Sequence, residues 1–244
     1  MKKRPAKKPT VVSPKKWLPA RLALLRQERA LDRQRDQLSA QRRKLPWVKV
    51  DQNYVFDTPA GRKSLADLFA GRNQLIVYHF MLGPDWEEGC RGCSFVSDHF
   101  DGALAHLGAR DITLTAVSSA PLKKIAGFKK RMGWKFPWVS SFGSTFNHDY
   151  GVTFTPEELA SGKVYYNYAV REAHLDELPG LSVFARDAAG NIYHTYSTYA
   201  RGLDLLIGAY NLIDLTPKGR NEDAEMPMKW VKHHDRYEHP IAAR

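Results

Sequence analysis

The chain has 244 residues, 43% of them hydrophobic, and a net charge of +11, which is enough for one domain with extensions. No apolar run approaches the roughly 20 residues that span a bilayer, and the basic N-terminus lacks the apolar segment of a secretory signal. These features argue against a membrane or exported protein, and we expect a cytoplasmic one.

The positive charge is concentrated near the N-terminus. Residues 1–44 carry a net charge of +12, whereas the rest of the chain carries −1. A basic arm suits nucleic acid, but no base-reading motif accompanies it, so the pattern does not favour a nucleic-acid partner. Residues 1–16 are rich in Lys and Pro and are predicted to be disordered.

Residues 17–45 predict a basic amphipathic helix that ends before Pro46. The second apolar column that a coiled coil needs is occupied by charged residues. The single apolar stripe therefore favours a helix lying along the domain or along a partner subunit, as in a homo-oligomer. The stripe recurs at every seventh position, at Trp17, Leu24, Leu31, Leu38 and Leu45.

The body of the protein begins with alternating apolar residues. Residues 48–56 predict paired strands followed by a turn at 57–61. Ser64 is a candidate N-cap for a short helix over 65–71. Residues 74–81, with the sequence QLIVYHFM, form the kind of continuous apolar run that is buried on both faces of a parallel sheet.

Strands and helices then alternate along the chain. The apolar spacing predicts helix over 94–111 and 121–134, and buried strands over 112–120 and 136–143. Two strands joined by a turn at 187–190 and a closing helix follow, over 181–198 and 201–215. This order predicts one α/β domain over residues 46–215, followed by a polar extension over 216–244 that could fold back through Trp230 and Val231.

The chain's two cysteines, Cys90 and Cys93, lie where the first buried strand meets the following helix. Backbone N–H groups at a helix start favour negative charge and lower a cysteine pKa from ~8.5 toward ~3.5–7.5. Cys90 is therefore the expected nucleophile, and Cys93 the thiol that resolves a mixed disulfide. Arg91 adds positive charge, Gly92 leaves room for a substrate backbone, and Trp86 either shields the pair or contacts a partner.

A dithiol of this kind uses no cofactor, and its expected partner is a protein or a small thiol or disulfide. Zinc binding and an inert buried pair are the alternatives. Structural zinc needs about four ligands, and the sequence contains no second cysteine pair, so we expect no metal site. Histidines near the cysteines are more typical of packed or solvated residues. His233, His234 and His239, in the polar tail, are more typical of surface residues.

Several tyrosines recur at short spacing on the later predicted strands. They either stack a ligand or pack the sheet, and their period of two or three favours sheet packing. These tyrosines are Tyr165, Tyr166, Tyr168, Tyr193, Tyr196 and Tyr199.

Four segments, LIVYHFMLGPDWEEGCRGCS, FPWVSS, DLTPKGRNE and WVKHHDRY, resemble a bacterial thioredoxin-like family known as domain of unknown function 899. The resemblance covers residues 17–237. It implies an α/β thioredoxin-like fold of the peroxiredoxin and alkyl-hydroperoxide-reductase branch, with a central mixed sheet flanked by helices and an N-terminal basic helix.

The resemblance also bears on individual residues. In thioredoxin-like folds a cis-proline just before a strand hairpin lies beside the reactive disulfide. Pro179, just before the hairpin predicted over 181–198, matches that position. Peroxiredoxins place a Pro and a Thr or Ser upstream of the peroxide-attacking cysteine. Here Pro84 is one residue too close to Cys90, and Glu87 occupies the place of the hydroxyl.

These observations predict a thiol–disulfide oxidoreductase that uses the Cys90–Cys93 couple. One alternative is a peroxiredoxin-like thiol peroxidase with the same two residues. The other is a non-enzymatic metal-binding or scaffold protein whose basic arm recruits an acidic partner.

Overall fold

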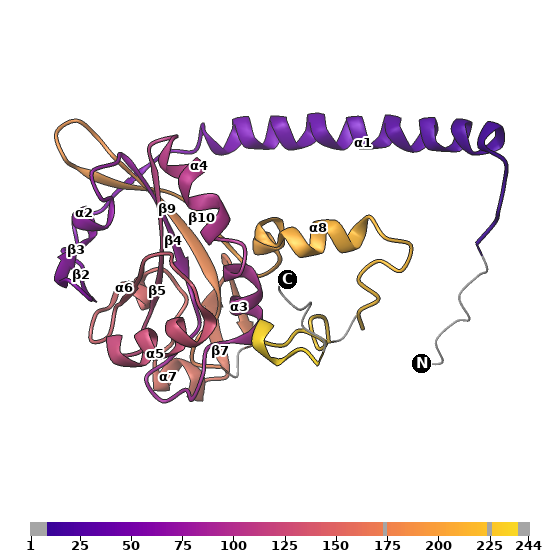
Figure 1. The fold of residues 1–244 in the computed structure, drawn as a ribbon. Coiled ribbons are helices and arrows are strands. Elements are labelled where there is room, and N and C mark those ends of the chain that lie inside the picture. The colour runs from indigo at the N-terminus through magenta and orange to yellow at the C-terminus, as the bar shows by residue number, and fades with distance from the viewer. Residues whose placement is uncertain (1–8, 173–174, 224–225, 239–244) are drawn as a thin grey trace. The chain divides into compact units, whose positions relative to one another are not determined.

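The computed structural model describes residues 9–172, 175–223 and 226–238. The chain forms two compact units, Met1–Pro46 and Trp47–Arg244. The first contains the helix α1 (Pro14–Arg42), which Figure 1 shows as one long helix. None of its side chains is buried. This helix begins before the predicted start at Trp17 because proline suits the first helical turn, where its missing N–H is not needed.

The predicted disorder of residues 1–16 can be compared with the structure only from residue 9 onward. Residues 1–8 lie outside the described residues, residues 9–13 contain no helix or strand, and residues 14–16 are helical.

The second unit is built on a mixed eight-stranded sheet with the strand order β1-β10-β9-β4-β5-β6-β2-β3 (Figure 1). Its strands β4, β5 and β6 are parallel, and β9 runs antiparallel to β4. Strands β7 and β8 form a separate hairpin. The strands are β1 (Val48–Lys49), β2 (Val55–Thr58), β3 (Gly61–Ser64), β4 (Gln74–His79), β5 (Ile112–Ser118), β6 (Trp138–Ser140), β7 (Lys163–Tyr166), β8 (Ala169–Glu172), β9 (Gly180–Arg186) and β10 (Ile192–Tyr199).

Short helices cover both faces of this sheet. One apolar core lies between the sheet and α3, α5 and α8, and a second lies between the opposite face and α2 and α6. The helices are α2 (Leu65–Leu68), α3 (Arg91–Ser97), α4 (Leu104–Gly108), α5 (Leu122–Met132), α6 (Phe146–Asp149), α7 (Pro156–Ala160) and α8 (Gly208–Asp214), with 3₁₀ turns η1 (Asp101–Ala103), η2 (Ala200–Leu206) and η3 (His234–Arg236).

Most of the predicted elements are confirmed. The apolar run forms β4, whose interior position in the sheet explains why both of its faces are apolar. Ser64 caps α2 through a capping box with Asp67. Strands β9 and β10 form the predicted hairpin, and its turn ends at Gly190, whose φ of 88° suits glycine. The sheet and its flanking helices confirm the α/β thioredoxin-like fold.

Three expectations about the fold are wrong or incomplete. β1 pairs with β10 and β2 pairs with β3, so residues 48–56 contribute to an edge strand, β1, and to a strand next to the opposite edge, β2. The closing helix is two pieces, η2 and α8, because Ile207 has a non-helical backbone. The hairpin of β7 and β8 was not predicted. Alternation indicates which face a strand buries, but it does not identify the strand's partner.

Pro179 directly precedes β9, as expected, but its peptide bond is trans, since no cis peptide occurs among the described residues. The expectation of a cis bond is therefore wrong; trans is the form that X–Pro bonds favour by about 0.5–1 kcal/mol. Within the described part of the chain, no helix has the length and apolar character to cross a membrane.

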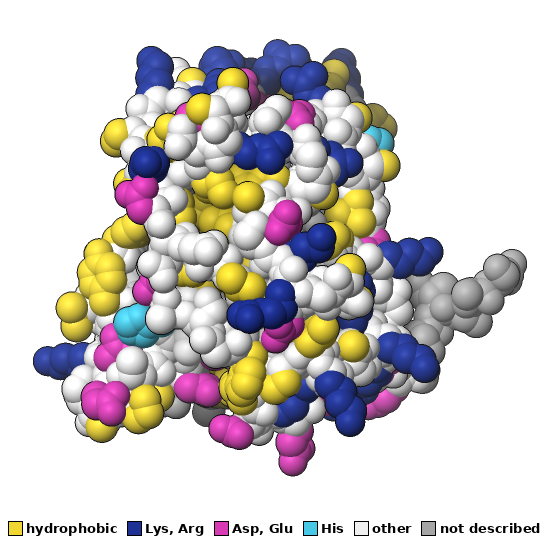
Figure 2. All heavy atoms as spheres, turned by 90° about the vertical axis from the view of Figure 1, so that its left-hand side faces the viewer, with side chains coloured by type: hydrophobic (Ala, Val, Ile, Leu, Met, Phe, Trp, Pro, Cys, Tyr) yellow, Lys and Arg dark blue, Asp and Glu magenta, His cyan; other side chains and the backbone are white. Residues whose placement is uncertain are grey.

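The surface of the second unit carries charges of both signs. On the face shown in Figure 2, acidic and basic side chains are interspersed, and hydrophobic side chains are visible in a recess between them. This mixture agrees with the net charge of −1 beyond residue 44.

Candidate functional site around Cys90 and Cys93

The two cysteines lie at the start of α3, on the loop that follows β4. Cys90 is the N-cap residue of α3, which confirms its predicted place at a helix start. Its N–H donates to the carbonyl oxygen of Met81 at 3.1 Å. Cys90 is half-buried, whereas Cys93 is only 1% exposed, and both are free thiols. The outer sulfur is therefore the one that a substrate can reach.

The environment of Cys90 stabilises its thiolate. A hydrogen bond from the Cys93 thiol is the main cause, and backbone N–H groups of Cys93 and Gly92 and the charge of Arg91 add to it. Burial opposes these effects, but together they lower the pKa of Cys90 from 9.0 to about 6. A thiolate at the N-cap of a helix is the nucleophilic form of cysteine.

Cys93 has the opposite character. Burial raises its pKa well above the usual value, and the neighbouring Cys90 sulfur raises it further. The backbone N–H of Met81 donates to its sulfur at 3.5 Å. The buried Tyr78 hydroxyl faces the same thiol, although its geometry is too poor for a regular hydrogen bond. The pair thus consists of one ionised outer sulfur and one protonated inner sulfur.

The structure also places the three other residues predicted near the pair. Arg91 is exposed, and Gly92 lies between Cys90 and the C-terminal segment, since a Cβ added there would be 3.7 Å from the Cys90 sulfur and 3.4 Å from Met228. Trp86 is half-buried, and its indole N–H donates to Asp176 at 3.0 Å. Trp86 therefore ties the cysteine loop to the segment before Pro179.

Pro179 is half-buried and lines a cavity of about 750 Å³. Met228, which is packed against the same core as Cys90, lines this cavity too. The cavity also has two arginines and three aspartates in its wall. Arg220 forms ion pairs there with Asp204 at 3.0 Å and with Asp214 at 2.8 Å. Neither cysteine lines this cavity, although Met228 connects its wall to Gly92 of the cysteine loop.

Residues 226–238, which we call the C-terminal strap, pack over the cysteine loop. Met228 lies against Gly92 as described, and the Trp230 ring contacts Phe95 of α3 at a centroid distance of 5.6 Å. Val231 is 1% exposed and belongs to the core. The strap is therefore part of the folded unit at the point where the sequence predicted a polar extension.

Histidine and arginine side chains anchor the strap to the loop. His233 is fully buried, and its Nε2–H donates to the Gly89 carbonyl oxygen at 2.8 Å while its Nδ1 accepts from Arg131 at 3.3 Å. Arg236 pairs with Glu88 at 2.7 Å. Gly89 has to be glycine because an added Cβ would lie 2.6 Å from a Phe80 ring carbon.

The expectation that the tail histidines are surface residues is confirmed for His234 and wrong for His233. His233 is buried, whereas His234 is exposed and lies 2.7 Å from Asp98. His239 lies outside the described residues. Trp230 and Val231, the residues through which the sequence suggested a fold-back, do pack onto the unit. The sequence did not identify the loop that the strap covers, because the anchors of the strap are long-range contacts.

Glu177 is a second buried group that the sequence did not indicate. It is 2% exposed, accepts a short hydrogen bond from the Ser119 hydroxyl, and lies 3.5 Å from Thr153 Oγ1. Burial raises the pKa of Glu177 to about 7. It lies two residues before Pro179 and next to Asp176, which accepts the hydrogen bond from Trp86.

No group of three or more His, Cys, Asp or Glu residues with metal-binding geometry occurs in the described part of the chain. The local geometry at Cys90 and Cys93 is that of a thiol pair, with each sulfur hydrogen-bonded within the protein. Fold and site together define a thioredoxin-like protein with a CxxC pair at a helix start.

The chain belongs to the family described as bacterial protein of unknown function (DUF899), whose model matches residues 6–237. No curated protein matches the sequence.

Solved structures with similar folds include a mutant of peroxiredoxin Q from Xanthomonas campestris, with 13% identity, coverage of 67% of this chain and 98% of that one, and a TM-score of 0.44. Peroxidoxin BcpB from Mycobacterium tuberculosis has 12% identity, coverage of 68% and 98%, and a TM-score of 0.42. A hypothetical protein from Sinorhizobium meliloti has 14% identity, coverage of 62% and 70%, and a TM-score of 0.38. TM-scores this low carry no functional argument.

Proposed function

We propose that this protein is a thiol–disulfide oxidoreductase in which Cys90 is the nucleophile and Cys93 the resolving thiol. The observation that carries the proposal is the contrast between the two sulfurs. Cys90 is half-buried with a lowered pKa, and Cys93 is buried with a raised one. A dithiol reductant needs this division between an attacking thiolate and a protonated partner.

The reaction follows from these protonation states. The Cys90 thiolate attacks one sulfur of a substrate disulfide, forms a mixed disulfide and releases the other substrate sulfur as a thiolate. Cys93 then loses its proton to solvent or to the leaving thiolate and attacks the Cys90 sulfur. The mixed disulfide breaks, the second substrate thiolate leaves, and two electrons have passed to the substrate. An external dithiol is needed to reduce the resulting Cys90–Cys93 disulfide.

A trapping experiment tests the assignment. Cys93→Ser removes the resolving sulfur, so incubation with oxidised glutathione or an oxidised model protein should leave a stable mixed disulfide on Cys90, detected by mass spectrometry. Cys90→Ser is the matched control and should form little adduct, because Cys93 is buried and protonated. Failure of Cys90 to form an adduct, while an exposed thiol in a reference protein reacts, would refute the proposal.

A thiol peroxidase is the second candidate, because an ionised Cys90 is also the form that attacks a peroxide. The peroxide would oxidise the Cys90 thiolate to a sulfenic acid and release water or an alcohol. Cys93 would then condense with the sulfenic acid to a disulfide, releasing a second water. Stopped-flow oxidation should separate the two candidates. Reaction with hydrogen peroxide no faster than that of free cysteine excludes the peroxidase and leaves the oxidoreductase.

A further inference from the structure

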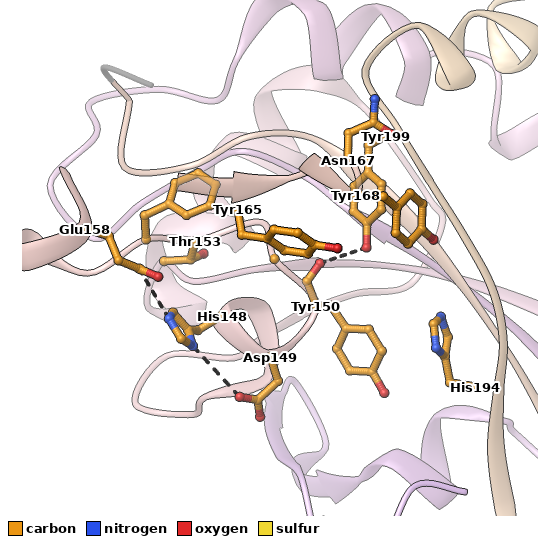
Figure 3. Close-up of a pocket in the computed structure, with 12 residues that line it drawn as sticks. His148, Asp149, Tyr150, Thr153, Glu158, Tyr165, Asn167, Tyr168, His194 and Tyr199 are labelled. Carbon is orange, nitrogen blue, oxygen red and sulfur yellow. Dashed lines mark hydrogen bonds and ion pairs between the residues drawn. The ribbon is translucent and has the colours of Figure 1, made fainter. Parts of the chain in front are cut away.

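A second cavity, of about 380 Å³, lies in the same unit and is lined by none of the residues of the cysteine site (Figure 3). Its walls come from α6 and the segment that follows it, from α7, from the β7–β8 hairpin and from β10. Cavities of roughly 300–1,000 Å³ are the size that proteins use for small organic ligands. The chemistry of the walls identifies the class of ligand.

Tyrosine rings form one side of the cavity. Tyr165 and Tyr168 lie on the β7–β8 hairpin and line the cavity. The sequence predicted that they pack against the sheet, but their side chains are 61% and 63% exposed. Tyr199 is 8% exposed, and its ring meets that of Tyr168 at 5.6 Å and 74°. These two rings meet edge to face, and all three tyrosines line the same cavity. The faces of aromatic rings attract cations. Figure 3 shows the three rings gathered on the same side of the cavity.

The position of Tyr168 carries a conformational cost. Residues Tyr166 and Ala169 pair across the hairpin, and the two residues between them, Asn167 and Tyr168, have φ values of 52° and 62°. A two-residue turn with both φ values positive favours Asn followed by Gly. Tyrosine in place of that glycine is strained, and strain of this kind is typical of functional positions. Packing explains only part of the side chain: its hydroxyl donates to the Ser197 carbonyl oxygen at 3.1 Å, but most of its surface is exposed.

The opposite side of the cavity carries negative charge. Asp149 and Glu158 line it, and His148 lies between them, 3.9 Å from Asp149 and 3.3 Å from Glu158. Both carboxylates are held in place: Asp149 accepts a hydrogen bond from the Tyr54 hydroxyl, and Glu158 accepts one from the backbone N–H of Thr155. Among the described residues that line the cavity there is no Lys or Arg.

We propose that this cavity binds a small, free organic cation with a quaternary or tertiary ammonium group. The ammonium group would lie against the faces of Tyr165 and Tyr168, with Asp149 and Glu158 supplying the opposite charge. A metal ion is a poorer match, because the described residues contain no cluster with metal-binding geometry and tyrosine faces do not ligate metals.

Choline is the probe, and dimethylbutanol, its uncharged carbon isostere, is the matched control ligand. Titration calorimetry or ligand-observed NMR should show saturable choline binding and binding of the isostere at least about tenfold weaker, because only choline has the charge that the rings and carboxylates attract. Binding should be the same in a Cys90→Ser/Cys93→Ser protein, since the cavity is separate from the cysteines. The result is thus independent of the proposed redox function.

Two variants locate the site. Tyr168→Gly removes one ring and its hydrogen bond to Ser197, and relief of the strained backbone offsets that loss, so the protein should still fold while choline binds at least about fivefold weaker. Glu158→Gln removes the charge but keeps an oxygen for the Thr155 N–H, and it should weaken choline binding by a similar factor. Phe142→Ala, at an exposed ring outside the cavity, is the control and should bind choline normally.

Four results would overturn the proposal. One is the absence of saturable choline binding, and another is equal binding of choline and dimethylbutanol. The third is unchanged choline affinity in Tyr168→Gly. Binding to phosphatidylcholine vesicles without binding of free choline would also overturn it, because the ligand would then be a lipid headgroup.

Discussion

The hydrogen bond from Cys93 to Cys90 offers the most direct way to test the electrostatics of the cysteine pair. With a pKa of about 6, roughly nine tenths of Cys90 is thiolate at pH 7, against roughly one per cent for a thiol at 9.0. The Cys93 thiol is the largest cause of this shift. Cys93→Ala removes the donor and leaves the helix start and Arg91 in place.

A hydrogen bond to a charged group contributes about 1.5–3 kcal/mol, and one pKa unit corresponds to about 1.4 kcal/mol. We therefore expect Cys93→Ala to raise the pKa of Cys90 by about one to two units. The measurement is the rate of alkylation by iodoacetamide as a function of pH, which follows the thiolate fraction. Because Cys90 is an acid, the midpoint should move to higher pH, and the rate at pH 7 should fall.

Cys93→Ser is the matched control, because its hydroxyl remains a donor; its midpoint should lie nearer to that of the unmodified protein. An unchanged midpoint in Cys93→Ala would show that the inner thiol does not stabilise the outer thiolate. The lowered pKa of Cys90 would then have to come from the backbone N–H groups and Arg91 alone.

Three further predictions concern the groups around the pair. Met228→Ala should speed alkylation of Cys90 severalfold without moving its pH midpoint, because Met228 covers the site but carries no charge; an unchanged rate would contradict this. His233→Ala leaves the buried Gly89 carbonyl unpaired and should cost about 1–3 kcal/mol in urea unfolding, whereas His234→Ala, at an exposed position, should cost far less. Glu177 has a pKa of about 7 in the folded protein and 4.5 as its usual value, so its contribution to stability is full below pH 4.5 and is lost as pH rises through 7. Glu177→Gln should therefore match the unmodified protein near pH 4.5 and be more stable above pH 7, by at most about 3 kcal/mol; equal stability at both pH values would refute the raised pKa.

The sequence was sufficient where the signal is local. Alternation and apolar runs identified β4 and the β9–β10 hairpin, and the Ser64 cap marked the start of α2. The spacing of Cys90 and Cys93 after a buried strand located the candidate site, because periodicity and helix-start chemistry depend on neighbours within a few residues.

The charge and burial of the site depended on contacts between distant segments. His233 reaches Gly89 across 144 positions, and Trp86 reaches Asp176 across 90. A polar tail with two apolar residues does not reveal which loop it will cover, and the trans bond at Pro179 contradicted a position-based expectation.

An α/β domain with a dithiol at a strand-to-helix junction could be read from the chain, since those features arise from local patterns of apolar residues and from the backbone groups next to the cysteines. The full burial of Cys93, the packing of the C-terminal strap against the cysteine loop, and the exposed tyrosines of an unpredicted hairpin opposite two carboxylates became known from the tertiary structure. Burial and charge pairing depend on which distant segments meet, and the packing of the whole unit settles that.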